Sequence, residues 1–483
     1  EEVALPQVEL SPDIFRAYDI RGIVGETLTG EGVEVIGRAI GSEALERGVE
    51  SLCIGYDGRH SSPDLADALA RGVVAAGCNV IHVGAVPTPV LYFATHELQT
   101  GSGVMVTGSH NPANYNGLKI MLGGATLSGE AIQKLYQRIQ TGDFASGRGS
   151  QSTEDVRRAY LDRIVGDIAV AAPLKVVVDA GNGIAGELAP MLIEELGCEV
   201  IPLYCDVDGD FPNHHPDPGK PANLADLIAR VESEGADIGL AFDGDGDRCG
   251  VIDNTGDEIF ADKVGVMLAR DISSQHADAK FVVDVKSTGL FMTDPVLQQN
   301  GAVTDYWKTG HSYIKRRVAE LGAIAGFEKS GHFFFNPPIG RGYDDGLTTA
   351  ISVCQMLDRN PDKSMADLYR ALPLTYGSPT MSPHCADEVK YDVIERVVDR
   401  FTAMKAADEQ IAGHPIVDLI TVNGVRVVAD DGTWGLVRAS SNKPELVVVV
   451  ESPVSEERKI EMFRAVDAIL RENEEVGAYN QSI

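Results

Sequence analysis

The chain has 483 residues, 44% of them hydrophobic, which is enough for several cores; at roughly 150 residues per domain it predicts three or four domains. Its 41 basic residues against 72 acidic ones give a net charge of -31. This charge disfavours nucleic acids and anionic membranes as partners because both are polyanions. A phosphate site would therefore have to concentrate cations and backbone N–H groups locally.

The sequence also excludes several cellular settings. No apolar run approaches the ~18 residues of a membrane-spanning helix, and the first residues, EEVALPQVELSPD, are acidic instead of basic and then apolar. A soluble, unexported protein is expected. The cysteines form no C-x-x-C pair, so neither a disulfide framework nor a zinc knuckle is indicated; they are Cys53, Cys78, Cys198, Cys205, Cys249, Cys354 and Cys385. A reducing cytoplasm fits this pattern.

One pattern occurs three times along the chain: an apolar run, a turn with Asp or Gly, a helical stretch, a glycine stop and a second apolar run. The copies span residues 51–84, 174–204 and, more faintly, 280–307. Each predicts a strand, a helix and a strand, and hence a mixed or mostly parallel sheet. The last region alternates strand-like runs with a helix from Glu456 to about Asn473. The predicted fold is α/β, with three similar mixed α/β domains and a C-terminal α+β domain.

Composition changes place the domain boundaries. The polar stretch TGDFASGRGSQSTED, the end of the acidic segment AFDGDGDRCGVIDNTGD and the connection MADLYRALPLTYGSPT each separate one pattern from the next. The expected domains are residues 1–153, 154–256, 257–368 and 369–483. A helix is expected within residues 130–139, and another at the start of the third domain, within 260–274.

The first loop with chemical potential is residues 107–112, TGSHNP, which follows an apolar strand and precedes a second strand from Leu118. Ser109 lies at an exposed turn, glycine beside it permits close approach of another group, and His110 and Lys119 offer charge or proton transfer. The sequence of this loop alone is equally compatible with a polar turn, because turns favour Ser, Asn, Gly and Pro.

The second loop places Asp243, Asp245 and Asp247 directly after a strand-like run. Three carboxylates at alternate positions form a hard oxygen site for Mg²⁺ or Ca²⁺. An EF-hand would require Gly at Arg248 and Glu at Asn254, so the comparison favours Mg²⁺. An acidic solvated turn is the alternative, although three unneutralised carboxylates would repel one another.

Two further loops suit ligand binding. Residues 326–332, GFEKSGH, offer Glu328 and Ser330 as acceptor and donor for sugar hydroxyls. Residues 438–444, RASSNKP, offer the bidentate fork of Arg438 with neighbouring hydroxyl and amide donors, which suits an oxyanion. Either loop alone could be ordinary turn chemistry, but four such loops fall one in each expected domain.

These loops resemble the α-D-phosphohexomutases, most closely the bacterial phosphomannomutase/phosphoglucomutase enzymes. The resemblance covers almost the whole chain, through FRAYDIRG, TGSHNPANYNGLK, FPNHHPDPGKPANL, AFDGDGDR, WKTGHS, FEKSGH and RASSNKP in family order. It implies four domains around a central active-site cleft, with one loop per domain. It also implies reversible conversion of mannose or glucose 1-phosphate and 6-phosphate through a phosphoserine and a hexose 1,6-bisphosphate, which would serve as intermediate and activator.

The resemblance assigns roles by position. Ser109 matches the phosphoserine, and Asp243, Asp245 and Asp247 match Mg²⁺ ligands, with a phosphoryl oxygen on Ser109 completing the sphere. The residues matching charge-stabilising or proton-transferring groups are Arg21, His110, Lys119, Arg248, Lys286 and His311, with acid and base unassigned. The matched substrate-binding residues are Tyr18, Lys308, Glu328, Ser330, His332, Arg438, Ser440, Ser441 and Asn442.

Two departures concern the substrate. The phosphate loop reads SSNKP where SNTTP or SGTEP is more typical, and the sugar loop reads FEKSGH where GEMSGH is common, so Lys443 and Lys329 add charge. A phosphoglucosamine mutase, a serine-nucleophile sugar phosphatase and a non-catalytic metal-binding protein remain alternatives. Phosphosugars are the expected partners, and the oligomeric state is left open, a monomer being one possibility.

Overall fold

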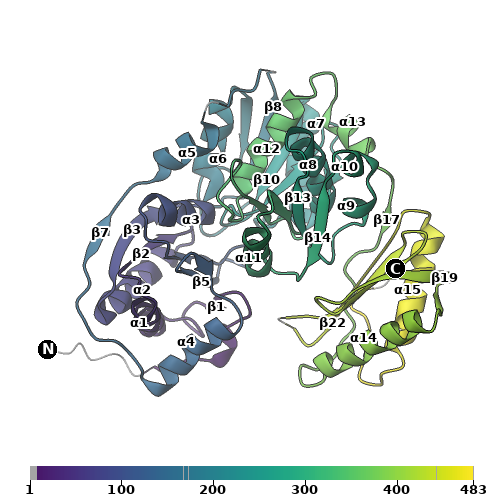
Figure 1. Cartoon of the computed structure of the whole chain (residues 1–483). Helices are drawn as coiled ribbons and strands as arrows, with labels where there is room; N and C mark the ends of the chain where they lie inside the picture. Colours follow the sequence, from purple (N-terminus) through teal and green to yellow (C-terminus); the bar gives the residue numbers. More distant parts are fainter. Residues whose placement is uncertain (1–7, 167, 172, 442, 482) are drawn as a thin grey trace. The chain divides into compact units, whose positions relative to one another are not determined.

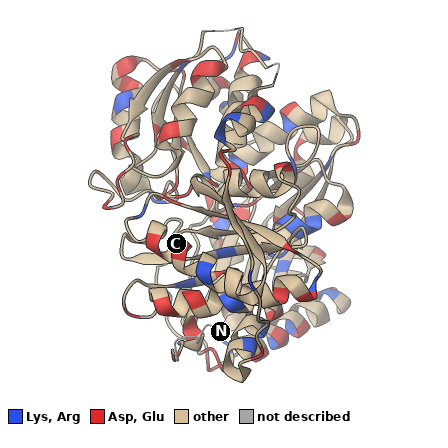
Figure 2. Ribbon diagram, turned by 90° about the vertical axis from the view of Figure 1, so that its left-hand side faces the viewer, with Lys and Arg blue, Asp and Glu red and all other residues tan. Residues whose placement is uncertain are grey.

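The computed structural model describes residues 8–166, 168–171, 173–441, 443–481 and 483. The chain divides into two compact units (Figure 1). The first runs to residue 261 and includes residues 330–366, and the second comprises residues 262–329 and 367–483. None of the helices in the described part of the chain combines the length and the hydropathy of a membrane span. Acidic and basic residues are interspersed along the helices (Figure 2).

The first sheet has the strand order β1-β5-β4-β2-β3-β7, with β6 paired to β5. Strand β2 pairs in parallel with β3 and β4, whereas β5 is antiparallel to β4. This arrangement confirms the first predicted strand-helix-strand unit. The strands are β1 (Ile20–Ile23), β2 (Ser51–Tyr56), β3 (Asn79–Ala85), β4 (Gly103–Val106), β5 (Tyr115–Leu122), β6 (Ala125–Thr126) and β7 (Gln151–Thr153). The helices are α1 (Gly30–Glu46), α2 (Ser62–Ala76), α3 (Thr88–Glu97) and α4 (Glu130–Thr141).

The second sheet, also in the first unit, has the order β12-β11-β10-β8-β9. Strands β8 and β9 are parallel and are the two strands of the second predicted strand-helix-strand unit. Buried Val176, Val177 and Val178 fill β8, as expected for a strand covered on both faces, whereas the edge strand β9 holds no buried side chain. The strands are β8 (Lys175–Asp179), β9 (Glu199–Leu203), β10 (Ile238–Phe242), β11 (Cys249–Ile252) and β12 (Glu258–Ile259), and the unit also holds β16 (Phe333–Phe335). The helices are α5 (Arg157–Val165), α6 (Ala185–Glu195), α7 (Ala225–Glu234) and α12 (Gly346–Asp358).

In the second unit, β13 (Lys280–Asp284) lies between β14 (Val303–Trp307) and β15 (Ala325–Phe327), all parallel. The third predicted unit is confirmed, but its helical stretch is two short helices. The break falls at Asp294 because Pro295 disfavours a helical conformation in the preceding residue, and the Asp294 side chain then caps the second helix. The helices are α8 (Ala261–Gln275), α9 (Leu290–Thr293), α10 (Pro295–Gln299) and α11 (His311–Leu321).

The last sheet has the order β17-β22-β21-β20-β19-β18, with antiparallel pairs throughout. Helices α14 and α15 contact both the sheet and each other, so they cover one of its faces (Figure 1). The α+β prediction is therefore confirmed. The strands are β17 (Tyr376–Gly377), β18 (Gln410–Ile411), β19 (His414–Ile420), β20 (Val425–Ala429), β21 (Trp434–Ala439) and β22 (Leu446–Ser452). The helices are α13 (Met365–Arg370), α14 (Lys390–Ala406) and α15 (Glu456–Leu470).

Candidate active site

Ser109 lies in the turn after β4 and is 4% exposed. Its φ angle is 50°, in the left-handed region that non-glycine residues rarely adopt. Its backbone N–H donates to the hydroxyl of Thr107 at 2.8 Å, and its own hydroxyl oxygen lies 3.2 Å from Nδ1 of His110. A solvated polar turn would need neither burial nor this conformation, so the geometry favours a functional serine.

Three carboxylates meet in the loop between β10 and β11. Oxygen atoms of Asp243, Asp245 and Asp247 lie within 4.8 Å of one another, and all three residues are buried. Burial and the charges of Asp247 and Asp245 raise the pKa of Asp243 well above its usual range. Among the described residues, none donates a hydrogen bond to Oδ1 of Asp245 or of Asp247. Buried hard oxygens without donors fit a divalent cation such as Mg²⁺, and burial contradicts the alternative of an acidic solvated turn.

Lys119 on β5 reaches this carboxylate cluster. Its Nζ atom lies 2.7 Å from Oδ2 of Asp245 and 2.6 Å from Oδ2 of Asp247. Burial alone would lower the pKa of Lys119, but these two carboxylates raise it well above the usual range, so the ammonium stays charged. The hydroxyl of Thr88 donates to the same Asp245 oxygen at 2.5 Å.

Two arginines flank the serine and the carboxylates. Arg21 donates to the carbonyl oxygen of Gly108 at 2.5 Å and to the side-chain oxygen of Asn111 at 2.9 Å. Arg248 donates through Nε to Asp243 at 3.1 Å, and its Nη2 lies 3.4 Å from a carboxylate oxygen of Asp217. Both guanidinium groups are buried, so basic side chains are concentrated at this site although the chain as a whole is acidic.

Two histidines complete this group. Burial, followed by the nearby Arg248 and Arg21, lowers the pKa of His110 well below its usual range, which keeps its imidazole neutral. His332 pairs through Nδ1 with Asp344 at 2.9 Å and lies 3.7 Å from Asp247. The first unit therefore brings together a hydroxyl, a carboxylate cluster, three cations and two imidazoles.

In the second unit, the loop after β13 carries Lys286. Burial lowers its pKa, the charge of Asp284 raises it, and Arg438 lowers and Glu328 raises it by smaller amounts. Lys286 therefore interacts electrostatically with Asp284, Arg438 and Glu328. Glu328 is 4% exposed and Arg438 7% exposed, which strengthens that interaction.

Asp284, at the end of β13, joins three loops of the second unit. Its carboxylate accepts hydrogen bonds from the hydroxyl of Ser287 at 2.6 Å, the hydroxyl of Thr309 at 3.0 Å and the backbone N–H of Lys329 at 2.9 Å. The loops that carry Lys286, Lys308 and Glu328 are thus held to one buried carboxylate; His311 begins helix α11 directly after the second of them.

Four family models match the chain in order. Their descriptions are phosphoglucomutase/phosphomannomutase alpha/beta/alpha domains I, II and III and the C-terminal domain. They cover residues 12–146, 158–256, 260–376 and 389–469. The chain belongs to the phosphoglucomutase/phosphomannomutase family. This membership confirms the resemblance to the α-D-phosphohexomutases.

Individual relatives agree with the family assignment. A phosphomannomutase/phosphoglucomutase of Pseudomonas aeruginosa is 48% identical over 93% of both chains. A phosphoglucomutase of Neisseria gonorrhoeae is 42% identical, over 95% of this chain and 97% of the relative. The solved structure of a phosphoglucomutase/phosphomannomutase family protein from Burkholderia thailandensis is 39% identical and superposes with a TM-score of 0.86, covering 96% and 98% of the two chains.

The predicted site residues of this family member fall into two sets, one in each compact unit. The first unit brings together those from the serine and carboxylate loops, with Ser330 joined through its carbonyl oxygen to Arg248 at 3.2 Å. Asn442 lies outside the described residues. Three residues that touch these groups were not predicted, because no motif or spacing marks a hydrogen-bond partner of a functional side chain: Thr88, Asp217 and Asp344.

Proposed function

We propose that this chain interconverts the 1-phosphates and 6-phosphates of mannose and glucose through a phosphoserine at Ser109 and a hexose 1,6-bisphosphate. Membership of the family makes it an isomerase of hexose phosphates. One observation carries the role of the serine. A Cβ atom at Gly244 would lie 2.2 Å from the carbonyl oxygen of Ser109, so the serine and carboxylate loops touch through their backbones.

Asp243, Asp245 and Asp247 would hold Mg²⁺, together with a phosphoryl oxygen on Ser109. The bound ion would neutralise charge on the transferring phosphoryl group. Arg21 and Arg248 supply fixed positive charge beside the serine loop, and Lys119 supplies it beside the carboxylates. Phosphoryl transfer requires little beyond such positioning and charge stabilisation.

The reaction comprises two transfers. In the first, the bond between phosphorus and Oγ of Ser109 breaks as a bond to the free sugar hydroxyl forms; that hydroxyl gives up its proton and the departing Oγ takes one up. In the second, the bond between the other phosphate and its sugar oxygen breaks as a bond to Oγ forms; Oγ gives up its proton and the departing sugar oxygen takes one up. Nδ1 of His110 lies 3.2 Å from Oγ, within hydrogen-bond reach, and we assign it to hold the serine proton.

The remaining predicted residues keep their proposed roles. Glu328 and Ser330 bind sugar hydroxyls, and His332 contributes beside them. The phosphate that is not reacting is bound by Arg438, Ser440, Ser441 and Asn442. Lys286, His311, Lys308 and Tyr18 assist substrate binding or charge stabilisation. The buried guanidinium of Arg438 supports the phosphate role because it offers bidentate donation with little competition from water.

We propose the domain boundaries, the cellular compartment and the substrate range on the same basis. Four domains at residues 1–153, 154–256, 257–368 and 369–483 would each contribute one loop. Seven free cysteines suit a reducing compartment, and we place the protein in the cytoplasm. The strongest alternative in substrate is glucosamine phosphate, since a probable phosphoglucosamine mutase of Methanothermobacter thermautotrophicus is 33% identical over 93% of this chain.

The test supplies the purified chain with Mg²⁺, a trace of hexose 1,6-bisphosphate and the 1-phosphates of mannose, glucose and glucosamine in turn. Products are identified by ³¹P NMR. We expect 6-phosphates from mannose and glucose, and intact mass spectrometry should find one phosphoryl group on Ser109. Ser109→Ala should abolish turnover, whereas Ser152→Ala, an exposed serine of the same domain, should not. Free phosphate as the product, or normal turnover by Ser109→Ala, would refute the proposal.

A further inference from the structure

The loop that follows β2 carries a buried ion pair to which the sequence assigned no role. Asp57 and Arg59 are each 1% exposed, and Nε of Arg59 lies 3.2 Å from Oδ2 of Asp57. A guanidinium group is rarely buried unless all its donors find acceptors, because desolvating an unpaired charge costs several kcal/mol. The positions of those acceptors therefore indicate what the pair does.

The guanidinium group of Arg59 binds the backbone of the serine loop. Its Nη2 donates to the carbonyl oxygens of Ser109 at 2.9 Å and Asn111 at 2.7 Å. Its Nη1 donates to those of Pro112 at 2.5 Å and Tyr115 at 3.1 Å. One rigid fork thus holds four carbonyl groups of the turn that presents the nucleophile.

Asp57 holds the other side of the same turn. Its Oδ2 atom accepts hydrogen bonds from the Thr107 hydroxyl at 2.8 Å and from the backbone N–H of Gly108 at 3.1 Å. The Thr107 hydroxyl in turn accepts from the N–H of Ser109. A Cβ atom at Gly108 would lie 2.2 Å from Cζ of Arg59, so only glycine permits this approach.

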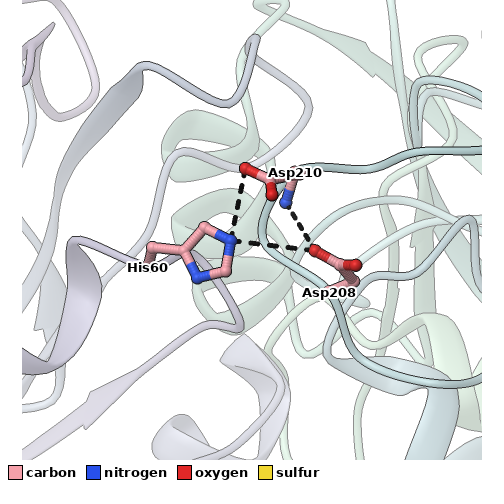
Figure 3. A group of neighbouring side chains, drawn as sticks. All are labelled: His60, Asp208 and Asp210. Atoms are coloured by element: carbon pink, nitrogen blue, oxygen red, sulfur yellow. Dashed lines mark hydrogen bonds and ion pairs between the residues drawn. The ribbon is translucent and has the colours of Figure 1, made fainter.

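Residues 207–211, which follow β9 in the same unit, contact Arg59 and the adjacent His60. The guanidinium carbon of Arg59 lies 5.1 Å from the ring centre of Phe211. His60 lies between Asp208 and Asp210, with Nε2 3.7 Å and 3.2 Å from their carboxylate oxygens (Figure 3). These contacts hold the Asp57–Arg59 loop to the neighbouring domain, which limits its freedom to shift.

We propose that the Asp57–Arg59 pair is the positioning element of the nucleophile. It holds Ser109 in its left-handed conformation, which is strained for a residue with a side chain and persists only where the surroundings determine it. Arg59 acts through the backbone of the serine loop, because the hydrogen bonds of its guanidinium group go to Asp57 and to four carbonyl oxygens of that loop. The expected loss of kcat rests on the proposed function, whereas the expected loosening of the serine loop does not.

A positioning role has a kinetic signature. A shift of about 1 Å at a reacting group costs about 100-fold in rate. Arg59→Ala should therefore lower kcat by about 100-fold, while KM changes by less than about threefold because no substrate contact is lost. Arg59→Lys should also lose more than about tenfold in kcat, since one ammonium group cannot hold four carbonyls. Guanidinium chloride at low millimolar concentration should restore part of the rate of Arg59→Ala, whereas methylammonium should not.

The chain offers a matched control in Arg38. This residue is 8% exposed, lies in the same domain, and donates to the carbonyl oxygen of Ala145 at 3.1 Å and the hydroxyl of Ser146. Its guanidinium carbon lies 5.6 Å from the ring centre of Phe144. Arg38→Ala removes an equivalent buried guanidinium far along the chain from Ser109. It should lower stability comparably but leave kcat within about threefold of wild type.

Hydrogen exchange separates the two proposals. Backbone amides of residues 107–117 should exchange faster in Arg59→Ala than in Arg38→Ala, whether or not the wild-type chain turns over hexose phosphates. If Arg59→Ala proves insoluble, Phe211→Leu should show the same direction with a loss of a few-fold in kcat. If the wild-type chain is active, equal kcat in the Arg59 and Arg38 variants would overturn the inference, and so would unchanged exchange in residues 107–117 in every case. An inactive wild-type chain with the expected exchange would refute only the proposed function.

Discussion

Replacing Lys119 by methionine tests whether the carboxylate cluster is built for a cation. Lys119 is 3% exposed and lies between Asp245 and Asp247. Methionine retains the length and apolar stem of lysine but removes the charge. The carboxylates would then be buried without their nearest neutralising group, and breaking a buried pair from one side costs about 3–5 kcal/mol.

This cost converts into a thermal shift. The first unit has about 300 residues, and an unfolding entropy of about 2.1 cal/mol/K per residue predicts that 3–5 kcal/mol lowers the midpoint by roughly 5–8 °C. The assay is thermal unfolding at pH 8 in EDTA, where the carboxylates of the unfolded chain are ionised. Adding Mg²⁺ should raise the midpoint of Lys119→Met more than that of wild type, because the ion replaces a charge that only the variant has lost.

Lys134→Met is the control. Lys134 is 53% exposed, and its partner Glu43 is buried but keeps Arg47 and Arg138, so the loss should cost at most about 1 kcal/mol and the variant should respond to Mg²⁺ as wild type does. If Lys119→Met in EDTA unfolds within about 1 °C of wild type, the electrostatic reasoning is wrong. Equal Mg²⁺ shifts in all three proteins would show that the ion does not bind at these carboxylates.

Three further changes probe other parts of the chain. Burial raises the pKa of Asp345 from 3.8 to about 6, so the folded state binds more protons than the unfolded state, and its stability falls as pH rises through that interval. Asp345→Asn should remove this dependence, which is worth about 2 kcal/mol between pH 4 and pH 7 at about 1.4 kcal/mol per pKa unit and is measured by urea unfolding at those two pH values. Gly244→Ala places a methyl group against the Ser109 carbonyl, and kcat should fall about 100-fold; a smaller change than tenfold would contradict the contact. Arg426→Met removes two hydrogen bonds to backbone carbonyls on either side of Lys286, and the second unit should lose about 3 kcal/mol in urea unfolding, whereas a loss below 1 kcal/mol would contradict it.

The periodicity of the sequence predicted the three strand-helix-strand units because each has apolar strands and a glycine stop that depend only on local residues. Helix α1 was not predicted. It contains Gly37, where a Cβ atom would lie 2.4 Å from the carbonyl oxygen of Leu69 on helix α2. The glycines that allow two helices to pack this closely also lower helix propensity, so tertiary contact removes the local signal.

The sequence indicated candidate site residues only where they stand in local motifs. Ser109 and the three aspartates stand in contiguous motifs, and a family resemblance named them. Arg21 reaches the serine loop because β1 pairs with β5 and sets Arg21 opposite Gly117, a pairing between distant segments that no local pattern specifies. Arg59 lies in the predicted first unit, yet its hydrogen bonds to four carbonyls depend on side-chain placement in the folded chain.

The charges of the site link its two proposed occupants. A divalent cation and a phosphoryl group of about two negative charges on Ser109 are equal and opposite, so binding both leaves the buried charge balance unchanged. Either one alone leaves a net charge in a region where Asp243 and Arg248 are already buried, and uncompensated charge there is costly. Phosphorylation of the serine should therefore tighten cation binding, and by reciprocity the cation should stabilise the phosphoserine. An acidic chain can thus hold a phosphorylated serine, because the same carboxylates that would repel the phosphoryl group retain the cation that offsets it.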